Sequence, residues 1–200
     1  MSTQPDPTQA PRGRPPTITP ERLADIGIRL GLPGLTMATV AAELAVSQAA
    51  LYKRVANLEA LKRLVADAVF QRWQIPRASR DAAGGLQGYL LTFVASLCEV
   101  VKAHPGLPPY LLRRSVATTP MLEKIAAHQV HVAEVYGLPI DKARWLLATL
   151  AFHCIAGADT IYAIADDEDG QVITDFRQGL RALVIGSLQV LKEDGADRSP

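Results

Sequence analysis

The sequence predicts an all-α fold of about nine helices. Three observations support this prediction. Apolar residues recur at helical spacing in almost every segment, and no segment alternates convincingly like a strand. Hydrophobic residues make up 48% of the chain, which is enough for a well-formed core. Residues that cap helices stand directly before several of the periodic segments.

The size and composition of the chain limit what it can be. Its 200 residues suffice for one or two domains. The richest apolar run, 145–158, is short and contains His153, so no membrane-spanning segment is expected. Residues 1–16 hold no apolar stretch and are not expected to form a secretory signal. Cys98 and Cys154 lack a metal-binding spacing, so we expect two reduced thiols in a cytoplasmic protein, with a bridge between them as the alternative.

The chain begins with a predicted disordered arm, 1–16, which is rich in Pro, Gln and Thr. A first domain, 17–73, follows the arm. Thr19 is a good N-cap and Pro20 suits the first helical position, so the first helix is predicted to begin there. Gly31 and Pro33 are expected to end this helix.

Three further helices are predicted in the first domain, each preceded by a side chain that can cap it. The caps are Thr36, Ser47 and Asn57. The corresponding helices are expected to end near residues 44, 55 and 76. This arrangement places two short helices side by side before a longer fourth one.

A second helical domain is predicted over 77–192. Its strongest amphipathic stripe covers 86–101, and the Pro-rich segment 104–109 interrupts the helical pattern. Further helices are expected over 110–116, 120–136, 141–164 and 172–192, followed by a frayed tail over 193–200.

The second and third helices are joined by residues 44–46 alone, a connection typical of a helix-turn-helix unit. In such a unit the second helix of the pair lies in the major groove of DNA. Leu51 and Val55 are one turn apart and can pack against the scaffold. The residues left on the other side are polar or small: Gln48, Ala49, Tyr52 and Lys53.

These residue types suit contact with duplex DNA. Gln48 can bond to an adenine edge, and the Ala49 methyl can touch a thymine methyl. Phosphates can accept hydrogen bonds from the Tyr52 hydroxyl, Lys53 and Arg54. Backbone N–H groups at Thr36 and Ser47, where two helices begin, are also suited to phosphate. The alternative is an ordinary helical corner with a solvated polar face.

The charge distribution agrees weakly with DNA binding. Residues 1–73 carry nine Lys or Arg against six Asp or Glu, and residues 74–200 carry twelve against fourteen. The net charge is only +1, but the positive end is the one that holds the helix-turn-helix pattern.

The segment 34–65, GLTMATVAAELAVSQAALYKRVANLEALKRLV, resembles the DNA-binding domain of the TetR family of transcriptional repressors. The resemblance spans about residues 19–69 and is carried by Thr36, Ala41-Ala42, Val46-Ser47, Leu51-Tyr52 and Val55. It implies DNA contacts from Thr36, Gln48, Ala49, Tyr52, Lys53 and Arg54. Three positions depart from the family pattern: Arg54 stands for a histidine, Leu58 for a lysine and Ala45 for a glycine.

The resemblance implies that the second domain binds a small-molecule effector and holds a homodimer on a palindromic operator in double-stranded DNA. The segment 104–107 is similar to the tetracycline-repressor-like branch, in which His104 would line a pocket or hinge. A plain helix-ending histidine is the alternative. Tyr89, Phe93, Trp145 and His153 could line an apolar pocket with a few polar groups.

The segment Arg12-Gly13-Arg14-Pro15 is a second candidate DNA contact. Short arms of this type can lie in a narrow A·T minor groove, whose negative potential favours arginine. Arg12 and Arg14 would make that contact. A soluble basic tail is an equally acceptable interpretation.

The last two predicted helices suit a two-fold interface. The first, 141–164, is apolar nearly all round, so more than one face must be covered. The second carries Gly179, Ala182 and Gly186, which permit close approach of another helix. An isologous dimer interface is expected. The alternative is that these helices only complete the core of one protomer.

Other chemistry is not favoured. His128 and His131 are three residues apart, which could suggest a metal, but we expect them on a solvated face opposite Leu122 and Ile125. His153, Cys154 and Asp159 could suggest a nucleophile, but buried packing is the better interpretation. No glycine-rich phosphate loop, metal cluster or acid–base pair is evident, so no cofactor and no enzymatic activity are expected. A helical enzyme, and a regulator without a small effector, are the alternative functions.

Overall fold

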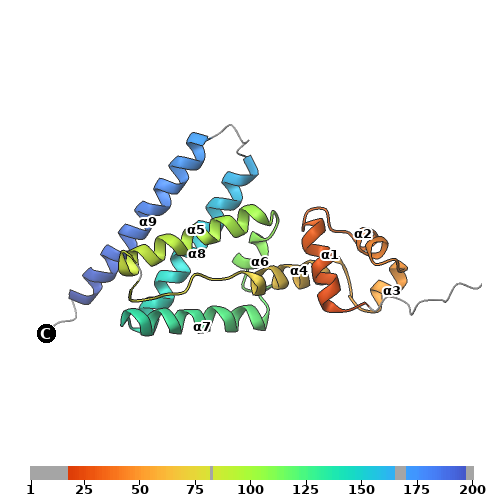
Figure 1. Ribbon diagram of the computed structural model, residues 1–200, viewed down its shortest axis with the longest axis horizontal. Helices are drawn as coiled ribbons and strands as arrows, with labels where there is room; N and C mark the ends of the chain where they lie inside the picture. Colours follow the sequence, from red (N-terminus) through yellow and green to blue (C-terminus); the bar gives the residue numbers. More distant parts are fainter. Residues whose placement is uncertain (1–17, 82, 165–169, 197–200) are drawn as a thin grey trace, which may run out of the picture.

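The computed structural model describes residues 18–81, 83–164 and 170–196. Within these ranges the chain forms nine α-helices and no strand, so the all-α prediction is confirmed (Figure 1). The helices are α1 Pro20–Leu30, α2 Met37–Glu43, α3 Gln48–Tyr52, α4 Leu58–Arg72, α5 Gly85–Ala103, α6 Pro108–Leu112, α7 Thr119–Tyr136, α8 Ile140–Ile164 and α9 Gly170–Ala196.

The first four helices begin where the sequence predicts. The side chains of Thr19, Thr36, Ser47 and Asn57 each accept a hydrogen bond from a backbone N–H in the first turn of the helix that follows. Thr36 also forms a reciprocal capping box with Thr39. These caps satisfy N–H groups that have no partner inside the helix.

Helices α1–α4 surround one apolar core. Leu35, Val40, Leu51 and Leu61 are completely or almost completely buried in it. Helix α1 lies very close to α4, because a Cβ atom placed on Gly27 would lie only 2.1 Å from Cγ2 of Val65. Glycine is therefore required at this crossing.

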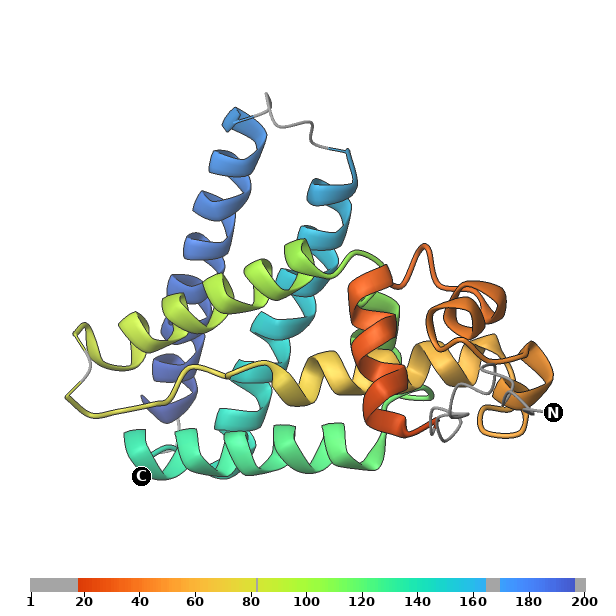
Figure 2. The ribbon, with the colours of Figure 1, turned by 45° about the vertical axis from the view of Figure 1, so that its right-hand side comes forward.

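Helices α5, α7, α8 and α9 form a second core. Leu90 of α5, Leu146 and Leu150 of α8, and Val184 of α9 are completely buried in it. Helices α8 and α9 run side by side in opposite directions, and both cross α5 (Figure 2).

The two cores meet at α4, α6 and the start of α7. Tyr110 and Met121 pack against the α1–α4 core although they follow it by many residues. Trp73, which caps the end of α4, packs against both cores. The fourth helix therefore continues out of the first domain into contact with the second (Figure 1).

Several helix boundaries differ from the predicted ones. Helix α4 ends at Arg72 rather than near residue 76, and α6 ends at Leu112 rather than at 116. Helix α3 ends at Tyr52 rather than near residue 55. Helix α6 begins at Pro108, because proline is compatible with the first helical positions and starts this helix instead of interrupting the pattern. Helix α9 continues to Ala196, beyond the expected start of a frayed tail at 193.

The expectation that no segment could span a bilayer needs correction. Helix α5 and residues 140–163 of α8 are long and apolar enough to cross a membrane by length and composition. Both helices contribute fully buried residues to the second core. A core helix passes the same test of length and composition, so the property is weak evidence for insertion.

Candidate nucleic-acid interface and ligand cavity

Helix α3 carries the residues that the sequence predicts to contact DNA, and it exposes them on the surface. Leu51 and Val55 are buried against the scaffold, with 0% and 6% of their surface exposed. Tyr52 is 51% exposed, an unusual state for a large aromatic side chain. The remaining predicted contact residues are all exposed: Thr36, Ser47, Gln48, Ala49, Lys53 and Arg54. The predicted outward face is therefore present on the surface.

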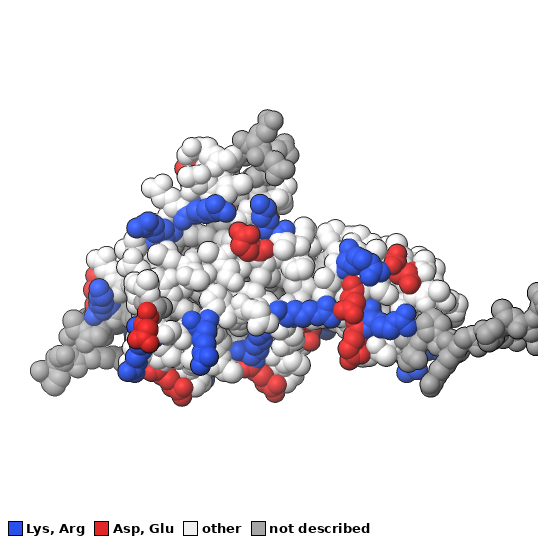
Figure 3. Space-filling view, viewed as in Figure 1, with Lys and Arg blue, Asp and Glu red and all other residues white. Residues whose placement is uncertain are grey.

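The basic side chains at the end of α3 are available for a partner. Among the described residues, neither Lys53 nor Arg54 takes part in an ion pair. Elsewhere in the domain Arg72 pairs with Asp25 at 2.6 Å, and Arg29 pairs with Glu43. Figure 3 shows basic and acidic side chains mixed along one face of this part of the molecule. For contact with phosphates, the unpaired positive charges of Lys53 and Arg54 are therefore more important than the small net charge of the whole chain.

The turn between α2 and α3 contains a left-handed alanine. Ala45 has a φ of 53°, and it is the one non-glycine residue with positive φ among the residues described. This is the position at which the family pattern has glycine, which adopts such a conformation without steric cost. The substitution is therefore more than a minor change, because it places strain in the turn that orients α3.

Arg12 and Arg14 lie outside the described residues. Their contact with a minor groove stays a prediction.

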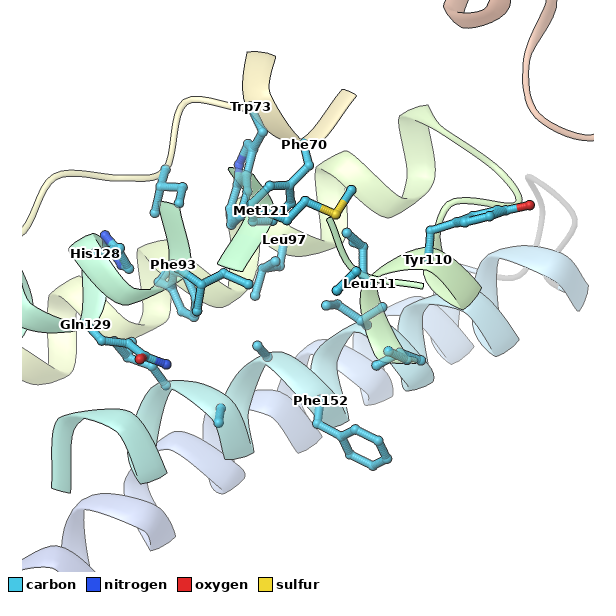
Figure 4. Close-up of a pocket in the computed structure, with 18 residues that line it drawn as sticks. Phe70, Trp73, Phe93, Leu97, Tyr110, Leu111, Met121, His128, Gln129 and Phe152 are labelled. Carbon is cyan, nitrogen blue, oxygen red and sulfur yellow. The ribbon is translucent and has the colours of Figure 1, made fainter. Parts of the chain in front are cut away.

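A cavity of about 340 Å³ lies between the end of α4 and helices α5–α8 (Figure 4). Its walls are almost entirely apolar, and aromatic and large aliphatic side chains predominate in them. The lining residues are Phe70, Trp73, Ile75, Phe93, Leu97, Tyr110, Leu111, Leu112, Ala117, Met121, Ile125, His128, Gln129, Leu147, Ala148, Ala151, Phe152 and Ile155. A concave apolar site of this size with few polar groups is typical of small-molecule binding.

Aromatic rings form a continuous series along one side of the cavity. The ring centroids of Phe70 and Trp73 are 5.7 Å apart, and those of Trp73 and Phe93 are 6.2 Å apart. Phe93 then stacks on His128 at 5.7 Å. The Trp73 indole N–H donates to Ser96 Oγ at 2.8 Å, which fixes the orientation of its ring.

The polar part of the cavity comes from α7. His128 and Gln129 line it, and the Tyr89 hydroxyl lies 2.6 Å from Nε2 of His128. Burial lowers the pKa of His128 to about 4, with a smaller contribution from His131. Burial also raises the pKa of Tyr89 above its usual value. Both groups are therefore uncharged at neutral pH.

The predicted effector residues are only partly brought together. Phe93 lines the cavity, and Tyr89 lies behind it as the partner of His128. Trp145 is 39% exposed and His153 is exposed, with Nδ1 of His153 against Thr149 O, and neither lines the cavity. His104 borders a separate recess of about 190 Å³ next to Trp73.

The expectation of a solvated face for His128 and His131 is wrong. Both histidines are half-buried, and His131 Nε2 lies 3.2 Å from Ala78 O. Leu122 and Ile125, expected to be covered, are 44% and 37% exposed. The reason is that α7 packs its histidine side against α5 and the chain before it, where each ring finds a hydrogen-bond partner.

No cluster that could hold a metal ion occurs among the described residues. The expectation of buried packing is confirmed for Cys154 but is wrong for His153 and Asp159, which are exposed. Sγ of Cys154 lies 3.2 Å from Sγ of Cys98 across α5 and α8. Both are free thiols. Cys154 and the exposed His153 therefore point to different surroundings, which agrees with a packing role for the cysteine.

Sequence reasoning missed the contribution of α4 to the cavity. Phe70 and Trp73 lie at the end of a helix that the sequence assigns wholly to the DNA-binding domain. The sequence did contain a signal for this contact. Two large aromatic residues close to the end of a domain indicate that further segments pack there.

Helix α7 holds the end of α4 through one lysine. The Lys124 ammonium donates to the carbonyls of Phe70, Gln71 and Trp73 at 2.9, 2.8 and 2.8 Å. These carbonyls belong to the last turn of α4, where the helix dipole favours a positive charge. Nearer the start of α4, Thr118 donates a hydrogen bond to Asp67, and Tyr110 donates one to Glu59 at 3.2 Å. Direct hydrogen bonds therefore connect the cavity walls to helix α4 of the α1–α4 core.

Helices α8 and α9 leave apolar and small residues uncovered. Phe152 of α8 is 55% exposed, and Figure 4 shows its ring directed away from Trp73 and Phe93. On α9, Ile185 is exposed, and a Cβ atom placed on Gly179 or Gly186 would meet nothing within 4 Å. Exposed large apolar side chains beside such small residues favour an interaction site on these two helices.

No protein-family model matches the sequence, and no curated protein matches it. Solved structures do match. A single-residue variant of TetR from Acinetobacter baumannii AYE, in complex with minocycline, is similar with a TM-score of 0.70 at 20% identity, over 87% of this chain and 98% of that one. Apo ActR from Streptomyces coelicolor has a TM-score of 0.68 at 19% identity, over 86% and 98%. The TetR family protein ActR in complex with (S)-DNPA has a TM-score of 0.66 at 19% identity, over the same shares.

Proposed function

We propose that this chain, which has the fold of TetR-family proteins, is a homodimeric transcriptional repressor released from DNA by a small molecule. The observation that carries the proposal is that α4 joins two sites. Its N-terminal part belongs to the helix-turn-helix domain, and Phe70 and Trp73 at its end form a wall of the cavity. A molecule that enters the cavity therefore contacts the helix that supports the DNA-binding domain.

Helix α3 is proposed to enter the major groove. Gln48 and Ala49 would contact base edges, while Tyr52, Lys53 and Arg54 would contact phosphates. Thr36 and Ser47, at the N-termini of α2 and α3, would bind the backbone through their free N–H groups. Support comes from the exposure of all these residues and from the absence of ion pairs at Lys53 and Arg54 among the residues described.

Helices α8 and α9 are proposed to form the two-fold interface. The uncovered Gly179 and Gly186 allow a partner helix to approach α9 closely, and Ile185 adds apolar surface. Burial of the same patch on both copies gives a closed dimer. The two α3 helices must then lie about 34 Å apart to reach successive major grooves of a palindromic operator.

The small molecule is proposed to act by preferring a conformation in which this separation is wrong. It can reduce DNA occupancy only by the difference between its affinities for the two conformations. Lys124, which holds the end of α4, and Met121, which packs on the α1–α4 core, both stand on the same helix as cavity residues His128 and Gln129. The neighbours whose structures contain minocycline and (S)-DNPA support a ligand-responsive role. A regulator of this kind acts in the cytoplasm and needs no cofactor.

The DNA-binding part is tested with the full-length protein. Selection from random duplexes is expected to yield a palindromic site. Fluorescence anisotropy then compares Lys53→Ala with the matched control Lys192→Ala on exposed α9. Loss of one phosphate contact is expected to weaken binding and reduce the salt dependence by about one counterion for Lys53→Ala only. Failure of every selected site to bind would contradict the proposal.

The ligand-control part is tested by filling the cavity. Ala151 lines it and is half-buried, so Ala151→Phe places a ring in the open space. The variant is expected to bind operator with unchanged affinity and to lose its response to any molecule that releases the original protein. Ala126→Phe, on the exposed side of α7, is the matched control. Retention of the response by Ala151→Phe would place the effector elsewhere.

The dimer is tested by light scattering. Gly186→Arg puts a long charged side chain on the uncovered side of α9 and is expected to give monomers. Ala126→Arg on α7 is the control and is expected to remain dimeric. A monomeric original protein would contradict the proposal.

A further inference from the structure

Resting on the proposed function, we infer that the cavity takes an uncharged molecule of about two or three fused aromatic rings that offers a hydrogen-bond acceptor to His128 and Gln129. The inference concerns the chemical class of the ligand. It follows from which groups line the cavity, which are already paired, and which are left without a partner.

The aromatic walls of the cavity indicate a flat aromatic ligand. Phe70, Trp73 and Phe93 form a series with centroid separations of 5.7 and 6.2 Å, and the Trp73 ring is fixed by its bond to Ser96. Fixed rings favour offset or edge-to-face contacts with another ring. A flexible aliphatic chain would gain less from such walls and would lose more rotamer entropy on binding.

An anionic ligand is disfavoured because the cavity offers it no free positive charge. None of the lining residues is a Lys or Arg. The nearby Lys124 has three N–H groups, and these already donate to the carbonyls of Phe70, Gln71 and Trp73. A carboxylate in the cavity would therefore be desolvated with no positive charge to compensate for it.

A cationic ligand is disfavoured for a different reason. Aromatic walls can attract cations through their ring faces. Here the Lys124 ammonium already lies 5.5 Å from the centroid of the Phe70 ring. A second cation in the same place would be repelled by the first, and no Asp or Glu lines the cavity to offset this.

The polar edge selects for an acceptor. The Tyr89 hydroxyl has no other acceptor within the described parts of the chain, so it donates to Nε2 of His128, and the single proton of the neutral imidazole is then on Nδ1. Burial keeps the pKa of His128 near 4, so this neutral form persists at physiological pH. Neither Nδ1 of His128 nor the Gln129 amide has a hydrogen-bond partner within the described parts of the chain. A ligand carbonyl can accept from either of them, and Figure 4 shows the Gln129 amide among the cavity side chains.

The test uses four naphthalenes of nearly equal size. They are 2-acetylnaphthalene, 2-ethylnaphthalene, 2-naphthoate and 2-(aminomethyl)naphthalene, which are respectively a neutral acceptor, a neutral hydrocarbon, an anion and a cation at about neutral pH. Calorimetry with the full-length protein in the syringe gives each affinity. The ketone is expected to bind about 3- to 10-fold more tightly than the hydrocarbon, as one net hydrogen bond allows. Both ions are expected to bind at least ~10-fold more weakly than the ketone.

Variants assign the preference to the polar edge. Gln129→Leu and His128→Phe preserve side-chain size, and together they are expected to abolish the advantage of the ketone while the hydrocarbon still binds. Gln74→Leu is the matched control, because Gln74 is exposed and lies between two lining residues without lining the cavity itself. Thermal melting establishes that each variant is folded.

Three results would overturn the inference. They are equal or tighter binding of either ion, a ketone preference that survives in the double variant, and no binding of the ketone by the folded original protein. None of these measurements involves DNA. The proposed function fails separately, if the same preparation binds no operator.

Discussion

The surface of α3 and the cavity differ in how the chain builds them. The α3 surface comes from one short segment, and two buried residues, Leu51 and Val55, are enough to orient it. The cavity needs residues from α4 to α8, which lie up to 85 positions apart between Phe70 and Ile155. The α3 surface is polar and exposed, whereas the cavity is concave and apolar. The difference teaches that one site depends on local sequence and the other on how the two cores are joined.

The largest expected effect is a loss of stability in the α1–α4 core alone. Gly27→Ala forces a Cβ atom against Val65, at 2.1 Å from Cγ2 in the present packing. We expect the free energy of unfolding of the α1–α4 domain to fall by about 2–3 kcal/mol, because overpacking at a helix crossing cannot relax cheaply. Urea denaturation followed by circular dichroism measures this. The second core should keep its stability.

Gly170→Ala serves as the control for this substitution. Nothing lies within 4 Å of a Cβ atom at Gly170, so a change of no more than about 0.5 kcal/mol is expected there. Equal effects at the two glycines would show that the α1–α4 crossing is not tight.

The next effect concerns recognition by α3. Gln48→Ala removes the amide side chain of α3, which can bond bidentately to adenine, so binding to the selected operator should weaken by about 1–3 kcal/mol, and the preference at that base pair should disappear. Competition binding with operators altered at single positions measures both. Uniform weakening across all sequences would indicate a phosphate contact instead.

The sequence predicts the α3 surface better than the cavity, because the α3 surface depends on local sequence. The four caps and the outward side of α3 were predictable, since a cap and a helix face depend on residues within a few positions of each other. The cavity was not, because it depends on packing between segments far apart. Phe93 was predicted from the amphipathic pattern of α5, but Phe70 and Trp73 were assigned to the other domain, and His128 to the surface.

A pH effect on stability is expected from His128 in the second core. The pKa of His128 is lowered from 6.5 to about 4 by burial, so between these values the unfolded chain binds more protons at this site than the folded chain. Stability is therefore expected to be retained above pH 6.5 and to fall as the pH is lowered towards 4. Thermal melts across this range, with His128→Phe showing a flatter dependence, test this.

His153→Phe is the control, because its ring is exposed outside the cavity. The histidine and tyrosine facing His128 are His131 and Tyr89, and neither is altered in these variants. An unchanged pH dependence in His128→Phe would show that other groups govern stability in this range.

The smallest expected effect is a gain in the stability of the α1–α4 domain. Ala45→Gly should stabilise the α1–α4 domain by up to about 1 kcal/mol, since a φ of 53° costs alanine more than it costs glycine. Operator affinity should change little, because the turn already holds α3 in place. Denaturation of the variant beside the original protein measures the gain, and a loss of stability would contradict the assigned turn conformation.

Helix α4 has 15 residues, which corresponds to a rod about 22 Å long at the usual rise per residue. One end of this rod is anchored by Lys124 near the cavity, and the tight contact of Gly27 with Val65 makes α1 turn with it. A sideways displacement of about 1 Å at the anchored end would tilt such a lever by about 3° around its far end. In the proposed dimer the two helices tilt in opposite senses, so the angle between them changes by about twice the tilt of each one.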